Sequence, residues 1–461
     1  MNWKRITAGV GGLLVVILTI LFFVLRPVVV GFGPEIKVGG VSRFSPIEIT
    51  FSREMRQETV EDRIEISPSI PGEFIWDGST LRFEPDAGWS AGTEIEVSLG
   101  EGGRSQLGLP LPGALSWTFG VAPVQLAYLW PAGSSANIYM MDLETGEASQ
   151  LTVTGGVISF TVNPDGLLVY YFAENSQGGT DLLLIDRFEG EAGRVMSCQR
   201  AICSEAVISP DGEWLAYQRG GVEIWALPLT GGGGEEIKIS TPNQTASFPA
   251  WSADGLLSFY DAEAEEFNVV DLEVGETITS WPNQSGELGV WAPGGNQFTA
   301  PDFIEYETDL LRGPTGEESN QPVDPSELDP VVVASSHLQR YSLDSSRVAD
   351  LTEDDLVEDY SPAYSPNGQL LAFTRRFLDE VRWTPGRQVW LISASGGQPR
   401  QLTNAPDYEY SALSWHPDGR QIAAVRFNVT LLTEQPEIWL LEINGAGTRL
   451  VINGYAPQWV P

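Results

Sequence analysis

Ile208-Ser209-Pro210-Asp211-Gly212 is one copy of a five-residue segment that recurs along most of this 461-residue chain. Proline fixes φ at the first corner of a turn, Asp or Asn favours the second, and glycine accepts positive φ, so the segment predicts a tight turn between antiparallel strands. The other copies are Val162-Asn163-Pro164-Asp165-Gly166, Trp251-Ser252-Ala253-Asp254-Gly255, Trp291-Ala292-Pro293-Gly294-Gly295, Tyr364-Ser365-Pro366-Asn367-Gly368 and Trp415-His416-Pro417-Asp418-Gly419.

The sequence around each turn predicts a four-stranded unit. An apolar strand such as Leu215-Ala216-Tyr217 follows the turn, then a strand such as Glu223-Ile224-Trp225, and then a strand of the type Gln401-Leu402-Thr403. The third residues of the copies are 46, 43, 40, 73 and 51 residues apart. Four strands in about 40–50 residues are typical of a β-propeller blade. The long step predicts one blade with an acidic, proline-rich insertion at about residues 305–331, looping out of one face.

The two ends of the repeat region, residues 123–461, predict how the ring closes. The region begins with Leu126-Ala127-Tyr128, a strand that should follow a turn, and ends with Pro457-Gln458-Trp459-Val460-Pro461, a strand that should precede one. Pairing them completes one further blade and removes the open sheet edges. We therefore expect an all-β chain whose propeller has seven blades, with six as the alternative.

A separate section, residues 35–121, contains six short strand signals divided by turn residues, which predicts an antiparallel β-sandwich. Its segments Pro46-Ile47-Glu48-Ile49-Thr50-Phe51-Ser52, Asp77-Gly78-Ser79-Thr80-Leu81, Ala91-Gly92-Thr93 and Trp117-Thr118-Phe119 resemble the bacterial Ig-like domains of S-layer and other surface proteins. The resemblance implies a spacer or adhesive module.

The repeats themselves resemble the TolB-type propeller family and its WD-repeat-like relatives, on the turn, Leu-Ala-Tyr and Gln-Leu-Thr patterns quoted above. The resemblance implies a protein-binding platform outside the cytoplasm. The chain departs from TolB-type proteins in lacking an α/β domain before the propeller, and it has no hydrolase domain after it.

The N-terminal sequence predicts a membrane anchor. Residues 6–25 carry no charge and would span about 30 Å as a helix, the thickness of a bilayer core. Lys4 and Arg5 precede this run, which places residues 1–5 in the cytoplasm and the domains outside. A cleaved signal peptide is the alternative, although the run is long and lacks a small-x-small site. Residues 26–34 are expected to be a tether.

The charge limits the partners. The chain has 62 acidic and 26 basic residues, a net charge of −36. The first 26 residues contain three basic residues and no acid, so the remainder carries −39. Neutralising phosphates requires clustered Lys and Arg, so nucleic acid is excluded, and basic proteins or divalent cations at the acidic surface are favoured.

Candidate chemical groups are few, and we expect no catalytic, cofactor or metal site. The segment Gly88-Trp89-Ser90-Ala91-Gly92 fits the nucleophile elbow of hydrolases but lacks the strand–turn–helix context. His416 occupies a turn position filled by Ser in other repeats, and His337 has no nearby acid–nucleophile pattern. Cys198 and Cys203 are expected to form a local disulfide in an oxidising compartment.

The tryptophans divide into two groups. Trp225, Trp390 and Trp439 lie at strand centres and are expected to pack between blades. Trp130, Trp281 and Trp383 lie nearer to predicted loops and are candidate contacts with a partner.

The sequence thus favours a membrane-anchored extracytoplasmic binding or scaffold protein. Its propeller would bind a protein or a glycan of the cell envelope, with the Ig-like domain as spacer. The alternatives are a hydrolase or lyase with a site in the propeller channel, and a purely structural surface component.

Overall fold

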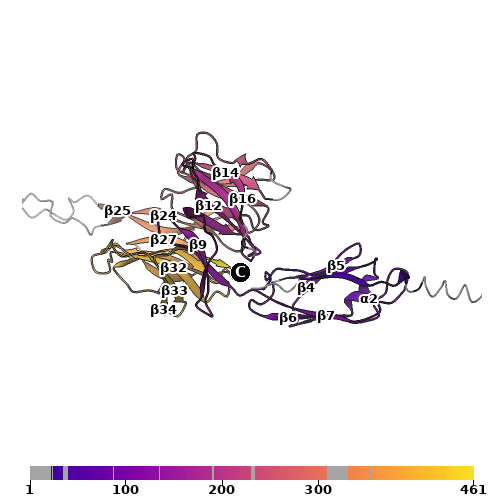
Figure 1. Ribbon diagram of the computed structural model, residues 1–461. Coiled ribbons are helices and arrows are strands. Elements are labelled where there is room, and N and C mark those ends of the chain that lie inside the picture. Colours follow the sequence, from indigo (N-terminus) through magenta and orange to yellow (C-terminus); the bar gives the residue numbers. More distant parts are fainter. Residues whose placement is uncertain are drawn as a thin grey trace, which may run out of the picture. The chain divides into compact units, whose positions relative to one another are not determined.

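The computed structural model describes residues 22, 24–34, 40–86, 88–133, 135–188, 190, 192–229, 234–308, 331–353 and 356–461. The chain divides into two compact units, the first reaching Val124 and the second comprising Gln125–Val460 (Figure 1). The described residues are almost entirely strand, turn and loop, which confirms the all-β prediction.

The first unit is a sandwich of two antiparallel sheets. One sheet has the order β1-β2-β5-β4 and the other β3-β6-β7. Side chains that alternate along the strands fill the space between the sheets, with Ile49, Val97 and Trp89 almost fully buried. The elements are β1 (Val29–Gly33), β2 (Ile47–Phe51), α2 (Gln57–Glu61), β3 (Ile64–Ser67), β4 (Gly72–Asp77), β5 (Thr80–Pro85), β6 (Glu94–Leu99) and β7 (Leu115–Gly120).

Strand β1 corrects the expected tether at residues 26–34. It pairs with β2, with Val29 opposite Phe51, and the Phe32 ring lies 5.0 Å from the Trp117 ring. The alternation of half-buried and exposed residues along Val29–Gly33 is that of an edge strand. The two glycines and the flanking prolines masked this pattern in the sequence.

The expected anchor at residues 6–25 lies outside the described residues, apart from residues 22, 24 and 25. Within the part of the chain that the structure describes, no helix has the length and apolar character needed to cross a membrane.

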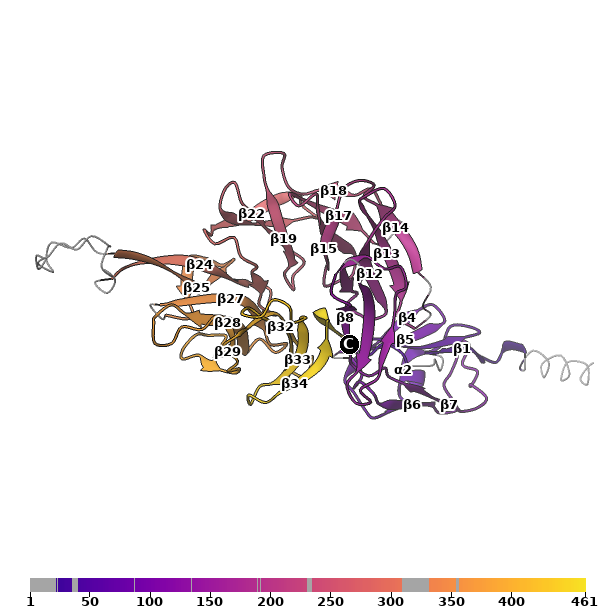
Figure 2. The same ribbon diagram turned by 60° about the vertical axis from the view of Figure 1, so that its left-hand side comes forward.

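The second unit contains seven groups of four antiparallel strands, which we call blades 1 to 7 (Figure 2). Their innermost strands contact one another in the closed order β35, β11, β15, β19, β23, β27, β31 and back to β35. This is the topology of a seven-bladed propeller.

The blades are formed as follows. Blade 1 contains β35 (Tyr455–Val460), β8 (Gln125–Trp130), β9 (Asn137–Asp142) and β10 (Ala148–Gln150), and blade 2 contains β11 (Val157–Val162), β12 (Leu168–Glu174), β13 (Thr180–Asp186) and β14 (Ala192–Ser197). Blade 3 contains β15 (Cys203–Ile208), β16 (Trp214–Arg219), β17 (Glu223–Pro228) and β18 (Ile237–Lys238), and blade 4 contains β19 (Ala246–Trp251), β20 (Leu257–Asp261), β21 (Glu266–Asp271) and β22 (Glu276–Pro282).

The remaining three blades follow the same order. Blade 5 contains β23 (Val290–Trp291), β24 (Gln297–Thr308), β25 (Val331–Ser342) and β26 (Ser345–Asp350). Blade 6 contains β27 (Val357–Tyr364), β28 (Leu370–Phe377), β29 (Gln388–Ser393) and β30 (Arg400–Gln401), and blade 7 contains β31 (Tyr408–Trp415), β32 (Gln421–Asn428), β33 (Glu437–Glu442) and β34 (Gly447–Ile452). A parallel bridge between Ser336 and Glu358 joins blades 5 and 6 into one sheet.

Each recurring turn joins the first and second strands of a blade. The six glycines at the fifth position, Gly166, Gly212, Gly255, Gly295, Gly368 and Gly419, all have φ between +67° and +82°. A side chain in this region is strained, so the repeated glycine is explained by backbone geometry alone.

The ring closes as the ends of the repeat region predict. Strand β35 pairs with β8, placing Trp459 opposite Leu126 and Val460 opposite Gln125. The Trp459 indole also donates a hydrogen bond of 3.0 Å to the Ser414 carbonyl of blade 7. Trp415 and Trp251 make the same bond to Ala363 and Val207 of their preceding blades. In each of these three blades, the tryptophan at this repeat position therefore forms a hydrogen bond to the preceding blade.

The long repeat step falls in blade 5. Strands β24 and β25 have twelve residues each and pair along their whole length, from Gln297 opposite Ser342 to Thr308 opposite Val331. Residues 305–308 and 331, expected in the insertion, are therefore strand, and residues 309–330 lie outside the described part of the chain.

Candidate functional site

One face of the propeller carries most of its irregular loops, and we call it the loop face. It is built from the loops between the second and third strands of each blade and from the connections that lead into the next blade. Backbone hydrogen bonds tie the two sets together: Ala262 donates to Thr245, Leu378 to Leu356, and Gly386 to Pro406. A rigid ring with variable loops on one face is a common arrangement for a binding site.

Four exposed apolar side chains lie on two loops of this face, 378–387 of blade 6 and 429–436 of blade 7, and others lie singly on its remaining loops. Val381 is 93% exposed, Leu432 81% and Trp383 53%, and Leu431 is also exposed. The connection from blade 6 to blade 7 contacts both loops. Gly386 of the first loop donates a hydrogen bond to the carbonyl of Pro406 in this connection, and Val429 of the second loop donates one to the carbonyl of Asp407. We call Val381, Trp383, Leu431 and Leu432 the apolar patch.

The charge around the apolar patch is negative. The arginines of these two loops are in ion pairs: Arg382 pairs with Asp379 at 2.6 Å, and Arg387 pairs with Glu358 at 3.1 Å and Glu409 at 2.9 Å. Exposed carboxylates on or beside the described loops of the loop face are Glu174, Glu263, Glu265, Glu353, Glu380, Asp407 and Glu434, whereas the exposed arginines there are Arg200 and Arg382. The field at this face therefore attracts cations.

The three tryptophans proposed as partner contacts have different surroundings. Trp383 is exposed within the apolar patch. Trp130 is 39% exposed, packs edge-on against Tyr139, and donates a hydrogen bond to the Ile452 carbonyl. Both remain available to a partner.

The prediction that Trp281 contacts a partner is wrong, because this side chain is only 6% exposed. Its ring lies 5.8 Å from Phe298 and 5.5 Å from Tyr341, both of blade 5, in a stacked arrangement. The side chain fills the interface between blades 4 and 5 and is therefore not an exposed contact. Its place near a strand end in the sequence did not reveal the neighbouring sheet that covers it.

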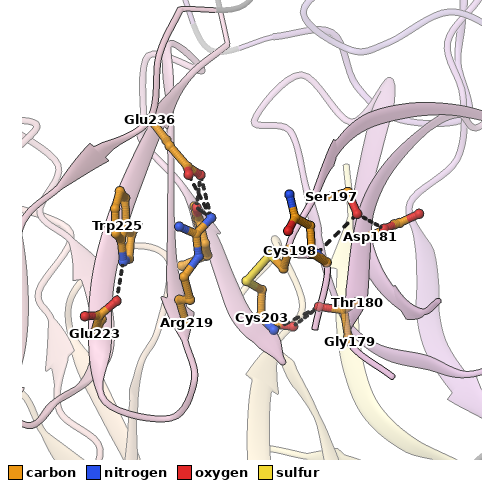
Figure 3. Close-up of a disulfide and its surroundings, with 12 residues drawn as sticks. Gly179, Thr180, Asp181, Ser197, Cys198, Cys203, Arg219, Glu223, Trp225 and Glu236 are labelled. Atoms are coloured by element: carbon orange, nitrogen blue, oxygen red, sulfur yellow. Dashed lines mark hydrogen bonds and ion pairs between the residues drawn. A yellow bond between two sulfur atoms is a disulfide. The ribbon is translucent and has the colours of Figure 1, made fainter. Parts of the chain in front are cut away.

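Cys198 and Cys203 are joined by a disulfide bond in the connection between blades 2 and 3 (Figure 3). Cys203 is fully buried, and its backbone amide and carbonyl both bond the Thr180 hydroxyl. The bridge holds the connection against the end of β13, whose Asp181 accepts a hydrogen bond from Ser197.

The two histidines have structural surroundings. The His416 ring packs edge-on against Trp459 at 4.5 Å, and its Nδ1 accepts a hydrogen bond from the Asp418 amide within the turn. His337 is fully buried in β25, with Nδ1 2.6 Å from the Asp350 carboxylate. Sequence inspection missed this acid, which lies 13 residues away. Ser90 of the elbow-like segment is followed by a turn and strand β6, and no helix.

A buried ion pair lies in blade 6. The Arg375 guanidinium donates two hydrogen bonds to Asp359, at 2.6 and 2.8 Å, and both side chains are at most 1% exposed. Burial pushes the pKa of Asp359 upward, and the Arg375 charge opposes this. Within the described residues, no group of three or more His, Cys, Asp or Glu side chains is placed to hold a metal ion.

Asp350 gives a testable pH dependence. Burial alone would raise its pKa, but hydrogen bonds from His337 and from the Thr352 and Glu353 amides hold it below its ordinary value. A carboxyl whose pKa is lower in the folded than in the unfolded state stabilises the fold above about pH 4, and this stabilisation is lost as the pH falls further. We expect Asp350→Asn to lower the unfolding free energy at pH 7 and to flatten its decline below pH 4.

Urea unfolding at pH 7, 5, 4 and 3 measures this effect. Asp344→Asn, an exposed carboxylate in the preceding turn, is the control. Parallel curves for wild type and Asp350→Asn below pH 4 would contradict the assigned role.

Parts of the chain are similar to known proteins. Residues 25–121 match the bacterial Ig-like domain family and are such a domain. The chain is 39% identical over 64 residues to the uncharacterized protein YidR of Escherichia coli (strain K12), a match that covers 14% of each chain.

Solved structures similar to the chain include TolB and WD-repeat propellers. Putative TolB from Agrobacterium tumefaciens is 14% identical, covering 72% of this chain and 91% of its own, with a TM-score of 0.38. TolB from Acinetobacter baumannii is 15% identical, covering 74% and 83%, with a TM-score of 0.41. The propeller domain of Cps50 (Swd1) from Myceliophteria thermophila is 15% identical, covering 63% and 87%, with a TM-score of 0.42.

Proposed function

We propose that the chain is an extracytoplasmic binding or scaffold protein, anchored through residues 6–25, whose propeller holds a protein partner on the loop face. The apolar patch within an acidic surround supports this proposal. Exposed large apolar side chains ringed by polar groups mark interaction sites. The Ig-like domain would act as a spacer between membrane and propeller.

The surface favours a partner with basic residues around an apolar contact. The described loop face has seven exposed carboxylates and two exposed arginines on or beside its loops. Such complementarity increases the association rate and excludes acidic competitors, while the buried apolar contact supplies most of the affinity. Binding should therefore weaken as salt is raised from about 0.05 to 0.5 M.

A channel hydrolase or lyase has less support. In the described residues, the buried His337 is paired with the half-buried Asp350, and Asp359 is paired with Arg375. These groups are paired with one another within their own blades and present no nucleophile with a positioned base.

The proposal is tested with the double variant Trp383→Ser, Leu432→Ser in the full chain. Chemical crosslinking in envelope membranes first identifies a stoichiometric partner, and the affinity of the purified pair is then measured. We expect the double variant to lose at least about tenfold in affinity, because central apolar anchors dominate protein interfaces.

The control is Ile278→Ser, Val348→Ser, which removes two apolar side chains that are 51% and 46% exposed from the outer strands β22 and β26. It should bind as the wild type does. Equal losses in both double variants, or binding that is insensitive to salt, would contradict docking at the loop face.

A further inference from the structure

Three blades share a module that sequence inspection did not find: an arginine at or near the end of the second strand covers a tryptophan in the third. Arg219 lies over Trp225 at 4.3 Å in blade 3, and Arg426 lies over Trp439 at 3.8 Å in blade 7. In blade 6, Arg375 lies 5.6 Å from the Trp390 ring, the longest of the three separations.

In blades 3 and 7, a glutamate two residues before the tryptophan completes the module. The Trp225 indole donates to Glu223 at 2.9 Å, and the Trp439 indole donates to Glu437 at 2.8 Å. Each glutamate also pairs with a cation: Lys238 for Glu223, and Arg426 and Arg449 for Glu437. In both blades, the indole N–H of the tryptophan therefore has its hydrogen-bond acceptor within the same blade.

Blade 6 departs from this arrangement. Gln388 occupies the glutamate position, and its amide nitrogen donates to the carbonyls of Ala405 and Tyr408 while its oxygen accepts from the Ala405 amide. Arg375 turns instead toward Asp359 of the inner strand β27. A cavity lies beside Arg375 and Trp390 of this blade.

That cavity has a volume of about 490 Å³ and lies between blades 5 and 6. Trp390, Phe377, Arg375 and Arg382 come from blade 6, as does the turn at residues 395–399. Asp350 at the end of β26 and residues 351–353 of the connection that follows it complete the wall. The volume is within the range of small-ligand sites, about 300–1,000 Å³.

The charges of the wall argue against an ionic ligand. Each guanidinium is paired with a carboxylate, Arg375 with Asp359 and Arg382 with Asp379. A bound anion would therefore gain little attraction from the arginines and would be repelled by Glu353. Asp350 is likewise paired with His337. A bound cation would therefore gain little attraction from Asp350 and would be repelled by two guanidinium groups. An apolar ligand would bury these polar groups at a cost.

A ligand rich in hydroxyl groups fits this wall. The wall combines the aromatic residues Trp390 and Phe377 with residues that carry hydrogen-bonding groups, namely Ser395, Gln398 and Glu353. We propose that the cavity between blades 5 and 6 binds an uncharged oligosaccharide. This site goes beyond the proposed protein partner and does not depend on it, because none of the four residues of the apolar patch lines the cavity.

The test is a glycan array carrying uncharged, acidic and basic oligosaccharides, probed with the full chain, followed by calorimetry on the best ligand. We expect uncharged oligosaccharides to bind, and Trp390→Leu to weaken binding by about tenfold or more through loss of the ring and its N–H. Trp439→Leu removes the same repeat position from a blade in which the module is complete, and it should change affinity less than about twofold.

The variant Gln398→Ala tests the same cavity in case Trp390→Leu fails to fold. Gln398 is exposed and lines the cavity, so its removal is not expected to disturb the core. It should weaken binding by about threefold to tenfold, the loss expected for one hydrogen bond. The proposal is overturned if no uncharged glycan on the array binds, if acidic or basic glycans bind best, or if Trp439→Leu weakens binding as much as Trp390→Leu. Loss of the protein partner in the apolar-patch variant with glycan binding intact would separate the two proposals.

Discussion

Removal of residues 457–461 is expected to lower the melting temperature by on the order of 10 °C or more, because it opens the propeller ring. The deletion removes Trp459 and Val460, both buried, and their pairing with β8. Losing a buried tryptophan alone costs about 3–5 kcal/mol. Differential scanning calorimetry of the full chain and the truncated chain measures the effect.

Trp459→Ala separates the two parts of this effect. It removes the hydrogen bond to Ser414 and the packing on His416 but leaves the strand, so its melting temperature should fall between those of the wild type and the truncated chain. Trp415→Ala, at the same position of blade 7, should cost a similar amount. A truncated chain that melts with the wild type would refute closure through β35.

Asp359→Asn is expected to destabilise the chain by about 3–5 kcal/mol, because it leaves the Arg375 guanidinium charged and buried without its counterion. Arg375→Met should cost a similar amount for the converse reason. Chemical denaturation at pH 7 measures both.

The double variant Asp359→Leu, Arg375→Met tests the cause. Since it removes both charges, it should be more stable than either single variant, although each partner also packs against neighbours. Arg194→Met, which removes an ion pair whose arginine is largely exposed, should change stability by less than about 0.5 kcal/mol. Single and double variants of equal stability would show that packing, and not the ion pair, sets the cost.

Local features of the sequence predicted most of the architecture. The six strands expected in residues 35–121 all occur, because alternating side chains and turn residues act over short distances. The ring closure was predictable because each end of the repeat region supplied one part of a split repeat. Strand β1 was missed, since its glycines and flanking prolines resemble a linker.

The sequence did not predict which side chains make contacts between blades. Trp281 is buried by Phe298 and Tyr341 of the next sheet, and no local pattern shows which residues face that sheet. The arginine–tryptophan modules were also missed, because loops of different length separate Arg219 from Trp225 and Arg375 from Trp390. Aligning the repeats by strand position, with the loops left out, would have found them.

The pairing of β35 with β8 has a consequence for the order in which the chain folds. Trp130, at the end of β8, bonds a carbonyl 322 residues later, so blade 1 cannot gain its innermost strand until nearly the whole propeller has left the ribosome. Such distant contacts slow the final folding step. Until then β8 presents an unpaired edge on which chaperones can act and proteases can attack, and an interrupted synthesis product stays in that state. Strand β35 thereby distinguishes a closed ring from an open one.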